Sequence, residues 1–432
     1  MQNKKPYLIA GLLLSIFLEL GFQTWWNKQW GDYASPIILL LAGLSTCYFA
    51  YHLLAFEKQT ALDLSAKKLI PKNLIIVLSI FAIGVFIVGK YYASIHARFP
   101  IDPGGHGSDV IPSLYLYVKR FLAGEFPYQP LEFRGWTVMP TYFPMMWLPY
   151  CFSEILEIDY RWTAYFVFLI PLLIYFWKIS KTEIHPLELV LKTTLPFVML
   201  YILMVHLDTA FGYGVEMMPI GLYFFLTLTI MHRSPLLMAL PIVCVLLSRY
   251  AFTFWLPVYM LILWSEKGFS QAFKVGLWVL VGILLLYVIP FLSKDPDIFT
   301  NGLKYYGKTA ESVWDWKRED GRPLMLIGGF SQAIFFHDFA SGELLDKLRL
   351  NRIFHISICF VTAIFIFWNY WRNKNKGLNV PIYLLITLKL YLVVFYGFFY
   401  VPFKYLYQLP LLLSLPILYH VSRFSKTDTS PS

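Results

Sequence analysis

Charged residues are scarce in this chain of 432 residues, and their scarcity defines its class. Asp, Glu, Lys and Arg make up 14% of the sequence, whereas a soluble domain carries about a quarter. Hydrophobic residues make up 58% and aromatic residues 19%. They gather in runs close to the ~20 residues that cross a hydrocarbon core. The composition excludes an ordinary soluble domain and predicts an all-α polytopic membrane protein.

Clustered cysteine and clustered positive charge are missing as well. The four cysteines stand singly at Cys47, Cys151, Cys244 and Cys359, so we expect neither a disulfide framework nor a cysteine-based metal site. The net charge of +10 is spread over short links between apolar runs, as the positive-inside rule describes for cytoplasmic loops. We therefore expect no nucleic-acid partner.

The apolar runs predict about twelve transmembrane helices, of which we expect the first to be retained. A run that follows Lys4 and Lys5 resembles a signal peptide, but no small-residue cleavage site follows it. The predicted spans are residues 7–25, 36–56, 74–94, 160–177, 187–206, 214–231, 235–248, 251–264, 272–292, 353–371, 380–400 and 404–420. The distribution of Lys and Arg between them places both termini in the cytoplasm.

A further apolar stretch, 139–156, is short and rich in proline. We expect an interfacial or partly inserted helix there, because a full span would move several basic links to the wrong side. The chain then divides into four regions. They are two N-terminal spans in residues 1–73, a core in 74–292 with a large outer loop at 94–159, a second large outer loop in 293–352, and C-terminal spans with a short cytoplasmic tail in 353–432.

The first outer loop contains the densest polar chemistry. Asp102, His106 and Asp109 lie in one glycine-rich turn, which lacks the Lys-Ser/Thr pair of a phosphate-binding loop. Apolar residues then recur at helical spacing over 110–122, which predicts a helix lying in the membrane interface. At its start, Asp109 is either a helix cap or a functional carboxylate. The three polar residues are also possible ligands for a divalent cation such as Mg²⁺ or Mn²⁺.

Short motifs follow Asp109 in a definite order. After the interfacial helix come Gly124-Glu125-Phe126-Pro127-Tyr128, then Tyr142-Phe143-Pro144 and a short apolar stretch. This order resembles the GT-C superfamily of integral-membrane glycosyltransferases, and residues 109–148 are most similar to its bacterial branch of polyprenol-phosphate-mannose-dependent enzymes. The chain differs from the pattern in its two additional N-terminal spans and in Tyr-Phe-Pro, where Tyr-Pro-Pro is common.

The resemblance implies a glycosyltransferase that moves a hexose or pentose from a polyprenyl-phosphate carrier to a glycan, lipid or protein acceptor, with inversion. It places the protein in the bacterial inner membrane, with a site that faces the periplasm or exterior. In such enzymes the acidic residue of the first outer loop, here Asp109, acts as a base or a metal ligand. That role is chemically sound, because an attacking hydroxyl must lose its proton.

The departing lipid phosphate needs a cation close by. Arg249 is the best candidate, because it lies between two short predicted spans at the outer surface, and the resemblance implies a phosphate ligand at the comparable turn. The alternative is an arginine that marks a helix end. Lys404 is a second candidate, for which anchoring at the membrane interface is the alternative.

Further polar residues fall near the same surface and are expected to line a substrate cavity. They are Asp102, His106, Tyr128, Arg134, Tyr142, His206, Asp208, Glu216 and Tyr407.

Two ionisable residues, Glu19 and Lys389, fall inside predicted spans, where charges are costly and usually paired or functional. They indicate either a proton path or a pairing between helices. A proton path would suit a transporter or flippase of lipid-linked sugars, a fold class that often contains internal repeats. No repeat is visible here. A non-catalytic membrane scaffold is a third alternative, which leaves the Asp109 loop without a role.

Overall fold

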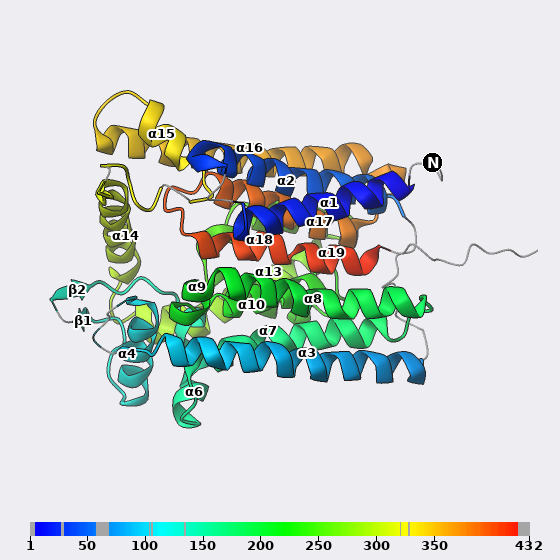
Figure 1. The fold of residues 1–432 in the computed structure, drawn as a ribbon, viewed down its shortest axis with the longest axis horizontal. Helices are drawn as coiled ribbons and strands as arrows, with labels where there is room; N and C mark the ends of the chain where they lie inside the picture. Colours follow the sequence, from blue (N-terminus) through cyan, green and yellow to red (C-terminus); the bar gives the residue numbers. More distant parts are fainter. Residues whose placement is uncertain are drawn as a thin grey trace, which may run out of the picture.

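The chain forms a bundle of helices with almost no sheet (Figure 1). The computed structural model describes residues 5–26, 30–57, 69–102, 104, 107–133, 135–319, 321–326 and 329–421. Within these residues, eight helices are long and apolar enough to cross a membrane. They are α1 (Lys5–Thr24), α2 (Gly31–Leu54), α3 (Pro71–Arg98), α7 (Tyr160–Ile179), α8 (Pro186–His206), α13 (Phe269–Ile283) with the π-helical η4 (Leu284–Leu292), α16 (Leu344–Asn373) with η5 (Lys374–Lys376), and α17 (Val380–Gly397). This is the architecture of an all-α membrane protein.

The other four predicted spans are shorter in the structure. Three of them contain α10 (Met217–Thr229), α11 (Pro235–Leu246) and α12 (Trp255–Lys267). The last is divided into η6 (Lys404–Tyr407), α18 (Gln408–Leu412) and α19 (Ser414–His420). Nearly all of α10 is buried against other helices, so its length is set by protein neighbours rather than by lipid. Twelve complete membrane crossings therefore stay a prediction.

Two segments that are distant in sequence meet at one end of the bundle, on the left of Figure 1. The first contains α4 (Val110–Leu122), the antiparallel strands β1 (Leu131–Phe133) and β2 (Trp136–Val138), and α6 (Cys151–Ile155), and the second contains α14 (Ile298–Asp315) and α15 (Ala333–Phe339). The stacked rings of Phe143 and Phe299, with centres 6.2 Å apart, join the two. Helix α1 begins and α19 ends at the opposite end (Figure 1).

Several element boundaries differ from those predicted, for identifiable reasons. Helix α4 forms as its apolar spacing predicts. Residues 139–156 instead contain three short pieces, α5 (Pro144–Trp147), η2 (Leu148–Tyr150) and α6, because Pro144 and Pro149 have no N–H to continue a helix. Helix α16 begins at Leu344, inside the predicted second outer loop. Its first turns are rich in charged residues, so their hydropathy is too low to predict a membrane span there.

A buried charge pair lies inside the bundle. Almost every side chain of α17 is buried, and among them Lys389 donates to Glu19 Oε2 at 2.8 Å and to the carbonyl oxygen of Pro410 at 2.7 Å. Thr46 donates to Glu19 Oε1 at 2.5 Å. The two charges therefore satisfy each other, as ionisable groups inside a membrane usually do. Of the two interpretations of these residues, the pairing between helices is present in the structure.

This pair yields a stability prediction. Lys389→Met should lower the free energy of unfolding by about 3–5 kcal/mol, because Glu19 then keeps a buried charge without its partner. The double variant Glu19→Gln/Lys389→Met removes both charges and should recover most of that loss. Thermal unfolding of the detergent-solubilised protein measures the effect, with Lys304→Met at an exposed position of α14 as the control. Equal destabilisation in the single and double variants would contradict the account.

Candidate functional site

Arg249 and Glu216 form an ion pair at the end of the bundle where the segments with α4 and α14 meet. We call this end the polar end. Arg249 lies between α11 and η3 (Tyr250–Phe252), and Glu216 comes directly before α10. Arg249 Nη2 lies 2.5 Å from Glu216 Oε1, with side-chain exposures of 17% and 7%. Met145 N also donates to the carbonyl oxygen of Leu247 at 2.9 Å, which fixes the segment before Arg249 against α5. Two residues predicted to belong to the site are therefore in direct contact.

Tyrosine side chains surround this ion pair. Tyr396 at the end of α17 and Tyr405 in η6 lie within electrostatic reach of both its charges. Tyr142, in the loop before α5, also lies within electrostatic reach of Arg249 and Glu216. Tyr306 reaches the guanidinium from α14. Because a tyrosine hydroxyl both donates and accepts hydrogen bonds, this surrounding is polar without adding charge.

Four buried polar atoms beside the pair have no hydrogen-bond partner among the residues that the structure describes: Arg249 Nη1 and the hydroxyl oxygens of Tyr150, Tyr223 and Tyr396. All three tyrosines lie within electrostatic reach of Arg249. Nearly all buried polar atoms of native proteins are hydrogen-bonded. These atoms therefore give the site unused capacity to bind the polar groups of a ligand.

Asp109 belongs to the same group of residues. Tyr142 and Tyr405 lie within electrostatic reach of Asp109 as well as of Arg249. Asp109 precedes α4 but its side chain makes no capping hydrogen bond, while Ser108 Oγ accepts from Val110 N at 3.2 Å. Burial raises the pKa of the Asp109 carboxyl above its ordinary value. We call Asp109, Tyr142, Glu216, Arg249 and Tyr405 the Asp109 cluster.

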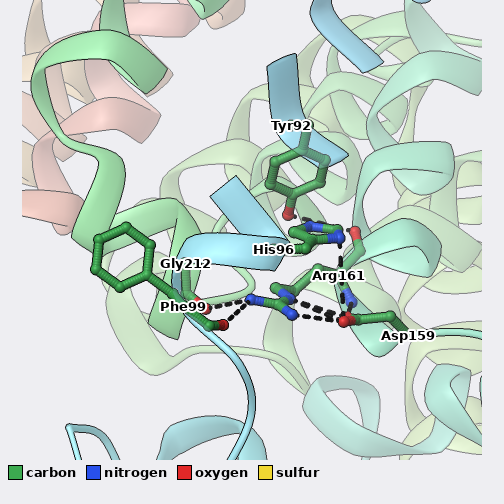
Figure 2. A network of polar contacts seen from close by, with 6 residues as sticks. All are labelled: Tyr92, His96, Phe99, Asp159, Arg161 and Gly212. Atoms are coloured by element: carbon green, nitrogen blue, oxygen red, sulfur yellow. Dashed lines mark hydrogen bonds and ion pairs between the residues drawn. The ribbon is translucent and has the colours of Figure 1, made fainter. Parts of the chain in front are cut away.

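A second arginine, Arg161, binds Asp159, Phe99 and Gly212, which come from three different chain segments (Figure 2). It lies in the first turn of α7 and is 2% exposed. Its Nε and Nη2 donate to the Asp159 carboxylate at 2.9 and 2.6 Å, and its Nη1 donates to the carbonyl oxygens of Phe99 and Gly212, both at 2.8 Å. Burial alone would raise the pKa of Asp159, but the hydrogen bonds and charge of Arg161 outweigh it and hold the pKa below its ordinary value.

The two carbonyl groups bound by Arg161 belong to the segments that lead to the Asp109 cluster. Phe99 ends α3 and begins the loop to Asp109. Gly212 lies in α9 (Asp208–Tyr213), a few residues before Glu216. One buried guanidinium thus fixes the starting points of both segments relative to α7.

The same two segments also contact each other directly. Gly107 has a φ of +86°, and a Cβ added there would lie 2.7 Å from the ring of Tyr213. Ser108 Oγ donates to the carbonyl oxygen of Tyr213 at 3.4 Å. Glycine is required at 107 both for its backbone conformation and for the close approach of the ring. The position of Asp109 therefore depends on that of α9.

Two predicted cavity residues support the cluster from outside. The hydroxyl of Tyr128 donates to the carbonyl oxygen of Tyr142 at 3.1 Å and accepts from Trp147 Nε1 at 3.2 Å. The hydroxyl of Tyr407 donates to the carbonyl oxygen of Tyr396. Both are buried, so they fix the backbone of residues in or near the cluster.

Other predicted residues make contacts elsewhere. Asp208 pairs with Arg98 at 2.9 Å, and the ring of His206 packs on Trp25 with centres 5.4 Å apart. Asp102 Oδ1 accepts from Gly104 N at 2.8 Å within its own turn.

Three further predictions stay open. The Lys404 ammonium lies 5.9 Å from the ring centre of Phe330, and its role as a phosphate ligand stays a prediction. His106 and Arg134 lie outside the described residues. Within the described residues, no group of three His, Cys, Asp or Glu side chains is placed to hold a metal ion. The Mg²⁺ or Mn²⁺ site that would include His106 also stays a prediction.

Sequence reasoning missed Arg161, Tyr306, Tyr396 and Tyr405. A signal for Arg161 is its position two residues after Asp159, at the start of a long apolar run, where a buried charge requires partners. The tyrosines belong to a chain with 30 tyrosines, and only their tertiary position distinguishes them.

No protein-family model, no curated protein and no solved structure has significant similarity to this chain. The functional conclusion therefore rests on the geometry of these residues.

A shorter side chain at position 161 should loosen the two chain segments that the hydrogen bonds of Arg161 hold. Arg161→Lys keeps the positive charge but cannot make all four bonds, and a hydrogen bond to a charged group contributes about 1.5–3 kcal/mol. Amide hydrogen exchange should therefore accelerate about 10–100-fold in residues 99–109 and 208–216. Mass spectrometry of peptides from both segments measures the rates.

The matched control is Arg372→Lys. The Arg372 guanidinium lies 5.5 Å from the ring centre of Trp368 in α16, so this exchange should leave both segments unchanged. Unaltered exchange in Arg161→Lys would show that Arg161 does not hold the segments.

Proposed function

We propose that this protein is a membrane glycosyltransferase. It transfers a sugar from a polyprenyl-phosphate carrier to the hydroxyl group of an acceptor at the polar end of the bundle. The observation that carries the proposal is the Asp109 cluster. It combines a half-buried carboxylate, Asp109, with a half-buried cation, Arg249, whose buried Nη1 has no protein partner among the described residues.

The reaction needs these two groups. The acceptor hydroxyl attacks the anomeric carbon of the sugar while Asp109 takes its proton. The bond from that carbon to the phosphate oxygen breaks, and the lipid phosphate leaves with the electron pair. Because the attack and the departure occur on opposite faces of the carbon, a single displacement inverts the anomeric configuration.

Arg249 suits the leaving phosphate better than the intact donor. The donor is a phosphodiester, whereas the departing lipid phosphate is a monoester with more negative charge. A cation placed here stabilises the transition state more than the ground state, which is what accelerates a reaction. Glu216 holds Arg249 through Nη2, so Nη1 is the atom available to the phosphate.

The architecture fits a lipid-linked donor. Eight long apolar helices form the bundle, and the start of α1 and the end of α19 lie at the end opposite the Asp109 cluster (Figure 1). We propose twelve crossings with both termini in the cytoplasm. The Asp109 cluster then faces the periplasm or exterior, and the membrane is a bacterial inner membrane.

A transporter or flippase of lipid-linked sugars is the second candidate. The observation that favours it is Lys389, which binds both Glu19 and a carbonyl in the broken helix pair α18 and α19, since transporters place ions at broken helices near the membrane midplane. Against it, the Lys389 ammonium already has two strong partners, whereas Arg249 Nη1 at the Asp109 cluster has none among the described residues.

Asp109→Asn should lower turnover about 10²–10⁴-fold, the usual contribution of a general base. The protein in nanodiscs receives a panel of polyprenyl-phosphate sugars with acceptor alcohols, and mass spectrometry follows loss of sugar from the carrier. Asp297→Asn is the matched control, because Asp297 also precedes a helix without capping it. Equal turnover in wild type and Asp109→Asn would remove Asp109 from the chemistry. Passage of an intact donor across vesicles without turnover would favour the transporter.

The pH dependence follows from the raised pKa of Asp109. The carboxyl must be deprotonated to accept a proton, so turnover should fall as pH drops through its pKa. Since burial raises that pKa, the acid limb of kcat should lie above the ordinary value of about 3.9. The residual activity of Asp109→Asn should lack this limb. An acid limb in the wild type at or below the ordinary value would contradict the assignment, provided that thermal unfolding is unchanged over the same pH range.

A further inference from the structure

An apolar groove lies between the start of α3 and the end of α7. These helix ends lie at the end of the bundle where α1 begins, opposite the Asp109 cluster (Figure 1). Its volume is ≈ 380 Å³, and the side chains that line it are Leu74, Val77, Leu78, Leu173, Ile174 and Trp177. Leu78 and Trp177 are 46% and 48% exposed, so the groove opens outward from the bundle. On helices long enough to span a membrane, a hydrocarbon chain matches such a lining.

Lysine side chains stand at the polar mouth of this groove. The Lys181 ammonium lies 3.5 Å from the ring centre of Trp177, which itself lines the groove. Lys72 lies in the first turn of α3 and is exposed. Glu183, in the turn between α7 and α8 that also contains Lys181, offsets one of these charges. The mouth of the groove therefore has a net positive charge.

A hydrogen bond holds the two sides of the mouth together. Asn73 Nδ2, from the start of α3, donates to the carbonyl oxygen of Thr182 at 3.0 Å. Both residues are buried. Lys72 and Lys181 are the sequence neighbours of this bonded pair. The hydrogen bond between Asn73 and Thr182 therefore keeps the backbone of the two lysines close together.

We propose that this groove binds one membrane phospholipid with an anionic headgroup. An acyl chain lies against the six apolar side chains, and the headgroup phosphate contacts Lys72 and Lys181. A neutral lipid would leave the lysines unused, and a second copy of this chain would bring the same positive charge to the same mouth. The proposal concerns the opposite end of the molecule from the Asp109 cluster and does not depend on the proposed function.

Photo-crosslinking tests the site. The full-length protein is placed in nanodiscs that contain phosphatidylglycerol and phosphatidylcholine in equal parts, and either lipid carries a diazirine in one acyl chain. Mass spectrometry then locates the labelled peptides. A basic residue near the membrane surface favours an anionic lipid about fivefold, so two should give about a 25-fold preference for phosphatidylglycerol in peptides that cover 71–78 and 173–181.

Two variants separate the headgroup from the tail. Lys72→Gln/Lys181→Gln should abolish the preference while labelling by phosphatidylcholine is unchanged. Ile174→Trp fills the groove and should lower labelling by both lipids. The control is Lys374→Gln, because the Lys374 ammonium also lies 3.5 Å from a tryptophan ring, that of Trp371, which does not line the groove.

Three results would overturn the proposal. Equal labelling by the two lipids in the wild type would show that the lysines do not select the headgroup. Equal loss of preference in Lys374→Gln would assign the selection to the general charge of this face. Crosslinks between two copies of the chain through the groove would identify a protein occupant.

Discussion

The hydrogen bonds of Arg161 are the interaction on which the polar end of the molecule depends. A guanidinium that is 2% exposed must be fully bonded, because an unpaired buried charge is very costly. Arg161 meets this requirement with one carboxylate and two backbone carbonyls. The carbonyls belong to the segments that lead to Asp109 and to Glu216, so satisfying this charge also places these two residues relative to each other.

Arg161 and Arg249 have different consequences because they differ in how fully they are bonded. All three guanidinium nitrogen atoms of Arg161 donate hydrogen bonds, to the Asp159 carboxylate and to the carbonyl oxygens of Phe99 and Gly212. Arg249 is held by Glu216 through Nη2, while its Nη1 has no partner in the described part of the chain. The first arrangement gives rigidity, and the second leaves binding capacity at a fixed position. A rigid support under a partly unsatisfied cation is what pre-organised binding of an anion requires.

The sequence predicted the parts of the fold that follow from local periodicity. The eight long apolar helices and α4 lie where hydropathy and helical spacing place them. Boundaries failed where another constraint decided them, as at the start of α16, whose first turns are charged, and in α10, which is buried among protein neighbours. Asp109, Glu216 and Arg249 could be proposed because charged residues are rare near apolar runs. Tyr405 could not, because nothing local distinguishes it from the other tyrosines.

The central claim is that Asp109 and Arg249 act on one lipid phosphate-linked sugar at the polar end of the bundle. Cryo-electron microscopy of the protein in nanodiscs with a non-transferable polyprenyl-phosphate sugar analogue tests it most directly. We expect a phosphate within hydrogen-bonding distance of Arg249 Nη1, with the anomeric carbon facing the Asp109 carboxylate. A phosphate bound inside the bundle near Lys389, or at the end where α1 begins, would contradict it.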